Sequence, residues 1–180
     1  MNPIRVVLVG TNTTDRSRIA RRLEYKHNFS RFAMLDGVRR IYRVIYGAGV
    51  YKGTSAAVKY DIYDALYKIS PDFWLTYMDS RLLKTDKDVV IPDPRYVYEV
   101  DELVKRGFVA VRVINYEGKK NFAVYKRNAA PGTVMLHEHF ASKKISAYYQ
   151  VVSYKDTANT DRGLEQMVET LRKYNLKLEP

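Results

Sequence analysis

The stretch Ile4-Arg-Val-Val-Leu-Val-Gly10, followed by Thr-Asn-Thr-Thr-Asp-Arg-Ser17, decides the fold. Its first six residues are mostly β-branched and nearly all apolar, and they stop at a glycine, which is typical of a strand buried on both faces of a parallel sheet. A polar loop from Thr11 to Asp15 follows, and its side-chain oxygens can cap a helix. From Ser17 onward apolar residues recur at helical spacing. The chain therefore opens with a strand, a loop and a helix.

The same alternation continues along the chain. Further buried strands are predicted at Val89–Ile91, at 108–114 and at 148–154. Helical spacing of apolar residues predicts helices over 29–46, 56–69, 72–83, 98–105 and 161–174. Strands that alternate with helices predict an α/β fold with a mostly parallel sheet flanked by helices. One domain over residues 1–180 accounts for the pattern, with a basic, lid-like excursion at about 115–145.

Composition excludes several kinds of chemistry. The chain has 180 residues, 46% of them hydrophobic, and no cysteine, which excludes disulfides, thiolate catalysis and cysteine-ligated zinc. No window approaches 18 consecutive apolar residues, and the apolar run at the start is too short for a secretory signal. We therefore expect a cytoplasmic protein without a membrane partner.

Positive charge is concentrated in the first third of the chain. The whole sequence has 31 Lys+Arg against 20 Asp+Glu, a net charge of +11. Residues 1–60 alone contain 12 basic and 3 acidic residues, or +9. A one-sided positive field favours polyanionic partners such as nucleotides or nucleic acid, and a surface that only maintains solubility is the alternative.

The loop after the first strand matches half of the phosphate-binding pattern G-x-x-x-x-G-K-[ST]. Gly10 and Ser17 are kept, whereas Asp15 replaces the second glycine and Arg16 replaces the lysine. A side chain and a carboxylate at the second glycine should weaken ATP binding, and a planar guanidinium is a poor substitute for a compact ammonium. The alternative is a simple strand-to-helix turn in which Asp15 stabilises the helix dipole.

A longer stretch of the chain resembles a known family. The segment Asp88-Val-Val-Ile-Pro-Asp-Pro-Arg-Tyr-Val-Tyr-Glu99 places an Asp-x-Arg after a buried strand, and a helix that ends at Gly107 and another strand follow. Phe73-Trp74 precedes this block, and Phe32-Ala33 and Gly53-Thr54 occur in the matching order. The sequence thus resembles the bacteriophage deoxynucleoside monophosphate (dNMP) kinases over roughly residues 4–114 and the last helix.

The resemblance implies a P-loop nucleotide kinase fold and transfer of the γ-phosphate of ATP to a dNMP, with Mg²⁺ as a cofactor and the host cytoplasm as the location. It implies three catalytic residues, which are Arg16, Asp93 and Arg95. The residues implied to bind ATP are Gly10, Thr13, Thr14, Arg16 and Ser17. Mg²⁺ would be held by Ser17 and Asp93, and the substrate by Arg39, Trp74 and Arg95. Nucleotides are the expected partners, nucleic acid is a further candidate, and a homodimer stays open.

Two other functions remain open from the sequence. The first is a non-catalytic relative of the family that binds nucleic acid or a partner protein through its basic surface. The second is a kinase of the same fold that acts on a modified base in DNA. At the level of single residues, Asp93-Pro94-Arg95 is alternatively a rigid turn after a strand. Tyr60, Tyr63, Tyr67 and Trp74 are candidates for stacking on a base, but aromatic residues at helical spacing more often belong to the core.

Overall fold

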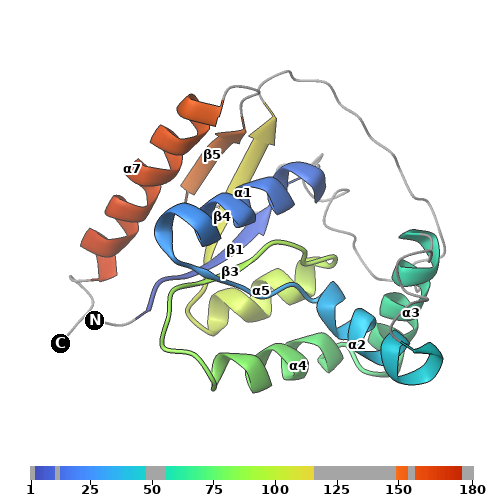
Figure 1. Cartoon of the computed structure of the whole chain (residues 1–180). Helices are drawn as coiled ribbons and strands as arrows, with labels where there is room; N and C mark the ends of the chain where they lie inside the picture. Colours follow the sequence, from blue (N-terminus) through green and yellow to red (C-terminus); the bar gives the residue numbers. More distant parts are fainter. Residues whose placement is uncertain (1–2, 11–12, 48–55, 116–148, 154–156, 176–180) are drawn as a thin grey trace.

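A computed structural model describes residues 3–10, 13–47, 56–115, 149–153 and 157–175 of the chain (Figure 1). The strands are β1 (Arg5–Val9), β2 (Ser30–Arg31), β3 (Val89–Ile91), β4 (Val109–Asn115) and β5 (Tyr149–Ser153). The helices are α1 (Thr13–His27), α2 (Leu35–Tyr46), α3 (Ala56–Ile69), α4 (Phe73–Leu82), α5 (Val97–Lys105) and α7 (Thr157–Asn175). The predicted α/β class is confirmed.

The five strands form one sheet in the order β2-β3-β1-β4-β5, and every neighbouring pair is parallel. β1 lies between β3 and β4, with Val6 opposite both Val90 and Val109. This confirms the prediction that the first strand and Val89–Ile91 are interior neighbours. Because all strands point the same way, their carboxyl ends lie along one edge of the sheet, where ligands bind in open α/β sheets.

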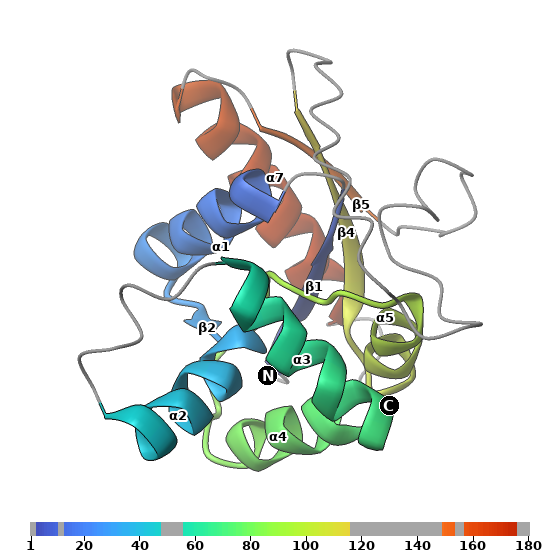
Figure 2. The same ribbon diagram turned by 90° about the vertical axis from the view of Figure 1, so that its right-hand side faces the viewer.

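Helices cover both faces of the sheet, as Figure 2 shows with α1 and α7 on one side and α5 on the other. Alternate residues of β1 enter the two cores. Val6 and Leu8 pack with residues of α1 and α7, while Val7 and Val9 pack with residues of α2, α3, α4 and α5. Because successive side chains of β1 enter two different apolar cores, almost every position of β1 is apolar.

Two predicted boundaries are wrong. The helix predicted over 29–46 contains a short strand, β2, before α2 begins at Leu35. β2 exists because backbone groups pair with β3, with Ser30 N donating to Asp88 O and Phe32 N donating to Val90 O. In addition, α1 begins at Thr13 rather than near Ser17, so residues expected in the loop belong to its first turn.

The remaining predicted elements are confirmed to within a few residues, including α7, whose Leu164, Met167, Val168 and Leu171 are buried as expected. Gly107 ends α5 with a positive φ of 84°, a conformation that favours glycine. The excursion predicted at 115–145 falls almost entirely outside the described residues. Within the described part of the chain, no helix is long and apolar enough to cross a membrane.

Candidate active site

Three of the sequence-predicted residues, Gly10, Arg16 and Asp93, lie close to the ends of β1 and β3. Gly10 follows β1 directly, Asp93 follows β3 after Pro92, and the two strands are paired neighbours. The side chain of Arg16, in the first turn of α1, reaches across to the segment after β3, where its Nη1 donates to Pro94 O at 3.1 Å. The first turn of α1 and the segment after β3 are therefore in direct contact.

Gly10 is required by packing between strands. A Cβ built on Gly10 would lie 2.6 Å from the carbonyl oxygen of Val113, a backbone atom of β4. A contact this short would force the two strands apart. The glycine of the first loop therefore has a structural role that is independent of any phosphate.

Arg16 is buried, with 7% of its surface exposed. Its Nη1 also lies 3.5 Å from Leu8 O, so the guanidinium sits against the ends of both β1 and β3. Burial lowers the pKa of Arg16, and the Asp93 and Glu99 carboxylates act in the opposite direction. Arg16 therefore contributes a positive charge to the interior of the site and joins the two strand ends.

Asp93 holds the start of a helix that lies far away in the sequence. Its Oδ1 accepts a hydrogen bond from Met34 N at 2.8 Å, and its Oδ2 accepts one from Leu35 N at 3.0 Å. These N–H groups belong to the amino end of α2, where donors lack partners within the helix. Burial raises the pKa of Asp93, while the two backbone donors and Arg16 act in the opposite direction.

Arg95 forms a two-pronged ion pair with Asp64 of α3. Its Nε donates to Oδ1 at 2.7 Å and its Nη2 donates to Oδ2 at 2.9 Å, and both side chains are about 14% exposed or less. The guanidinium also lies 4.5 Å from the centre of the Tyr60 ring, which is a cation–π contact. Arg95 therefore ties the segment after β3 to α3.

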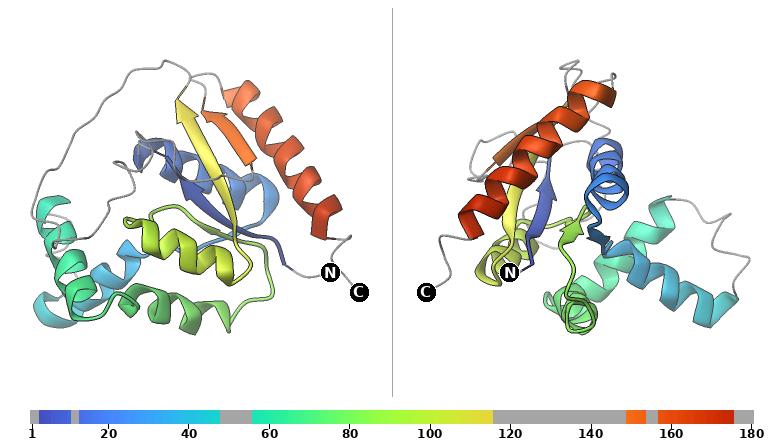
Figure 3. Two further views of the ribbon diagram at one scale, coloured as in Figure 1. Left: turned by 180° about the vertical axis from the view of Figure 1, so that it is seen from behind. Right: turned by 60° about the vertical axis from the view of Figure 1, so that its left-hand side comes forward.

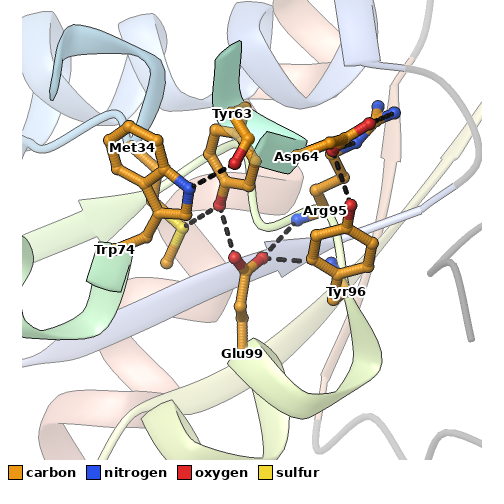
Figure 4. Close-up of polar contacts among 7 residues, drawn as sticks. All are labelled: Met34, Tyr63, Asp64, Trp74, Arg95, Tyr96 and Glu99. Carbon is orange, nitrogen blue, oxygen red and sulfur yellow. Dashed lines mark hydrogen bonds and ion pairs between the residues drawn. The ribbon is translucent and has the colours of Figure 1, made fainter. Parts of the chain in front are cut away.

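Glu99 forms the centre of a buried network, drawn in Figure 4. Its Oε1 accepts from the Tyr63 hydroxyl at 2.5 Å, and its Oε2 accepts from Arg95 N at 2.7 Å and from Tyr96 N at 3.0 Å. Burial raises the pKa of Glu99 to about 7, although all three donors act to lower it. The carboxyl therefore fixes the backbone of Arg95 at the start of α5, which sets the direction of its guanidinium.

Ser17 lines a pocket between α1 and α3 whose charged described residues are all cationic. The described lining consists of Ser17, Arg18, Arg21, Arg22, Tyr25, Lys26 and Tyr60. Two of the cations have acidic neighbours, since Arg18 pairs with Asp15 at 2.9 Å and Arg22 pairs with Asp161. Tyr60 connects this pocket to Arg95, whose guanidinium it contacts.

Two residues implied by the family resemblance lie elsewhere. Trp74 is completely buried, and its Nε1 donates to Tyr63 O at 3.1 Å, so no base can stack on it. The assignment of Trp74 to substrate binding is therefore wrong, because its ring fills the core. Arg39 lies on an exposed part of α2, 3.4 Å from Asp36, and lines a separate groove. The side chains of Thr13 and Thr14 lie outside the described residues.

The residues at the strand ends fit the two implied cofactors, Mg²⁺ and ATP, unequally. Both Asp93 oxygens already accept backbone N–H groups and Arg16 lies beside them, so the carboxylate does not fit a direct ligand of Mg²⁺ in this structure. The cationic lining beside Ser17 fits the phosphates of ATP better.

Asp64 and Glu99 are important residues of this site that the sequence argument did not assign. Asp64 is 31 residues from its partner Arg95, and nothing in its local sequence distinguishes it from Asp61. Glu99 carried a recognisable signal, because it stands at the third position of α5, where a glutamate commonly caps the helix start.

The all-parallel sheet in this strand order, with helices on both faces, gives the chain an α/β fold of the nucleotide-kinase type. Solved structures agree, since the chain is similar to a gluconokinase from Sinorhizobium meliloti 1021. The TM-score is 0.50, the sequence identity is 10%, and the match covers 98% of both chains. No protein-family model matches the sequence, and no curated protein matches it significantly.

Proposed function

We propose that the protein is a phosphotransferase that moves the γ-phosphoryl group of ATP to the phosphate of a dNMP. The observation that supports the proposal is the contact between the first turn of α1 and the segment after β3, where Arg16 Nη1 donates to the carbonyl oxygen of Pro94, between Asp93 and Arg95. In this reaction a phosphate oxygen of the dNMP bonds to the γ-phosphorus while the bond to the β-phosphate oxygen breaks, which yields ADP and a dNDP. Such a reaction needs positioning and charge neutralisation rather than a covalent intermediate.

Arg95 is the residue best suited to hold the acceptor phosphate. A guanidinium bonds a phosphate through the same two parallel hydrogen bonds that it makes with a carboxylate. Asp64 occupies that fork now, so a phosphate would have to displace it. Glu99 keeps the Arg95 backbone in place during the exchange, because its Oε2 accepts hydrogen bonds from the main-chain N–H groups of Arg95 and Tyr96.

A second candidate is a relative that binds a phosphorylated ligand without phosphoryl transfer. The observation in its favour is the position of Arg16, whose guanidinium is buried against the Leu8 and Pro94 carbonyl groups. A lysine at this place in the phosphate-binding pattern reaches the β- and γ-phosphates. The arginine here supports the strand ends instead.

Ligand-induced stabilisation followed by a turnover assay tests the proposal. The melting temperature is measured with ATP and Mg²⁺, with ADP and with each of the four dNMPs, and a ligand at about 100 times its Kd should add roughly 2.7 kcal/mol. Turnover is then followed as ADP release with each dNMP. Ser17→Ala should reduce the shift with ATP, whereas Thr170→Ala, which removes an exposed hydroxyl of α7, should leave it unchanged.

The outcomes separate the two candidates. Stabilisation by ATP together with ADP release that depends on a dNMP supports the kinase. Stabilisation without turnover supports the non-catalytic relative. If no nucleotide changes the melting temperature, the kinase proposal is wrong, and the ligand of the second candidate is not a nucleotide.

A further inference from the structure

A second cationic surface lies outside the edge strand β2, between α2 and the carboxyl end of α4. A groove of about 830 Å³ runs there. Its described lining consists of Ser30, Phe32, Asp36, Arg39, Arg40, Arg43, Val44, Tyr77, Ser80, Arg81, Lys84, Thr85, Asp86 and Lys87. None of these residues lines the Ser17 pocket. We call this surface the α2–α4 groove.

Cations stand on both walls of the α2–α4 groove. One wall, formed by α2, contributes Arg39, Arg40 and Arg43. The other wall contributes Arg81, Lys84 and Lys87. The acidic residues of the described lining are Asp36 and Asp86. The net charge of the described lining is +4. Asp36 is shared by two of the cations, at 3.4 Å from Arg39 and 3.7 Å from Arg81. Cations on facing walls suit an extended polyanion better than a single small anion.

The groove also contains aromatic rings beside its charges. The Arg81 guanidinium lies 4.4 Å from the centre of the Phe32 ring and 6.0 Å from that of Tyr77. Its Nη1 donates to the Tyr77 hydroxyl at 3.4 Å. Rings and a stacked guanidinium offer flat surfaces to unpaired bases, while the flanking cations bind the phosphates.

We infer that the α2–α4 groove binds single-stranded nucleic acid. The cations of the two walls contact successive phosphates, and Tyr77 and Arg81 contact bases. The inference concerns a surface with its own residues and does not depend on turnover at the strand ends. It also accounts for part of the charge excess in the first third of the chain, since the three arginines of α2 belong to that third.

Binding is measured by fluorescence anisotropy with a labelled 12-nucleotide oligo-dT at several salt concentrations. Each phosphate contact with a single strand changes the slope of log K against log salt by about −0.7. About four contacts therefore give a slope of about −3. Reversing two cations should make the slope less steep by about 1.4 and weaken binding at low salt.

Three double variants carry the same change in charge. Arg40→Glu with Arg43→Glu alters one wall, and Lys84→Glu with Lys87→Glu alters the other; all four side chains are exposed, so folding should survive. The matched control is Arg162→Glu with Lys173→Glu on α7, which packs on β5 at the opposite edge of the sheet. Figure 3 shows α7 well separated from α2 and α4. Each variant is also tested for melting temperature and for phosphotransfer.

Weaker binding in both groove variants, with normal binding by the α7 variant, supports the inference. Equal weakening in all three variants would overturn it, because only net charge would then matter. A fourth double variant, Arg21→Glu with Lys26→Glu in the Ser17 pocket, should bind normally, and loss of binding in this variant alone would also overturn the inference. dTMP is titrated as the mononucleotide control, and equal affinity for dTMP and the oligonucleotide would overturn it as well. Absence of oligonucleotide binding overturns it even where phosphotransfer is present, so its failure is distinct from that of the proposed kinase.

Discussion

Arg95 and Asp64 are joined by two parallel hydrogen bonds of 2.7 and 2.9 Å, although 31 residues separate them in the chain. The Tyr96 hydroxyl donates at 2.5 Å to Asp64 Oδ1, which also accepts the hydrogen bond from Arg95 Nε. This pair connects α3 to the segment after β3. The Asp64 carboxylate also occupies the two guanidinium donors of Arg95 that a phosphate would bind.

Arg95→Lys should lower both turnover and stability. A lysine keeps the charge but makes one hydrogen bond to Asp64 where the arginine makes two, so unfolding should become easier by about 1.5 kcal/mol. If Arg95 holds the acceptor phosphate, turnover should fall by about tenfold or more. Urea unfolding and a steady-state assay on the same preparation measure the two effects.

Arg106→Lys is the matched control for that variant. Arg106 also contacts both oxygens of one carboxylate, Asp79, at 2.9 and 2.8 Å, but this pair is more exposed. Exposed pairs contribute at most about 1 kcal/mol, so the control should be nearly as stable as the unmodified protein and fully active. Equal loss of turnover in both variants would contradict the role of Arg95.

Asp64→Asn should strengthen the binding of a phosphorylated ligand. The substitution keeps the size of the side chain and removes the charge that competes with phosphate for Arg95. Calorimetric titration with a dNMP measures the effect, with Asp79→Asn as the control. Weaker binding would show that Arg95 depends on Asp64 for its position.

Stability should decrease as the pH rises from about 4.5 to about 7. Burial raises the pKa of Glu99 from 4.5 to about 7, so in this range the folded protein keeps a proton that the unfolded chain has released. The contribution of Glu99 to the free energy of unfolding is complete below pH 4.5 and is lost as the pH rises to about 7. The slope of the unfolding free energy should reach at most about −1.4 kcal/mol per pH unit from this group.

Glu99→Gln tests this assignment, because an amide does not titrate and can accept the backbone N–H groups while donating to Tyr63. Urea unfolding at pH 5, 6, 7 and 8 should show a flatter profile for Glu99→Gln. Glu102→Gln, on the same helix and paired with Lys105, should keep the original slope. An unchanged slope in Glu99→Gln would rule out Glu99 as the source.

Gly37→Ala should destabilise the protein although alanine favours helices. A Cβ at Gly37 would lie 2.6 Å from Cζ3 of Trp74, which is fully buried and cannot move aside easily. Overpacking of this kind costs about 1–3 kcal/mol. Gly163→Ala in α7 has no atom within 4 Å of the new methyl group and should stabilise the protein by up to about 1 kcal/mol. Thermal unfolding of both variants measures the difference, and two stabilised variants would contradict the packing argument.

Most of the sheet could be predicted from the sequence, because β1, β3 and β4 are apolar runs set by burial on both faces. β2 could not, since its two polar residues are held by hydrogen bonds to Asp88 and Val90 in another part of the chain. The start of α1 was placed too late, because Thr13 and Thr14 are residues that favour helix caps and are here included in the helix.

The site was predicted in part. The Asp-x-Arg block and the first loop were correctly placed at neighbouring strand ends, because parallel strands bring their carboxyl ends together. The partners of these residues could not be predicted. Asp93 bonds to α2 and Arg95 bonds to Asp64, and both contacts depend on how the helices between β2 and β3 pack.

The parallel pairing of β4 with β5 has a consequence for the order in which the protein folds. These strands make their contacts across a long stretch of chain, with Val111 opposite Tyr149 and Asn115 opposite Ser153. During synthesis the ribosome releases β1 and β4 well before β5, so the edge of β4 remains open until the last part of the chain emerges. An open edge of this kind is a template for pairing with other chains, and contacts that are far apart in sequence form slowly. Between the synthesis of β4 and that of β5, the nascent protein therefore exposes a strand edge that can pair with another chain.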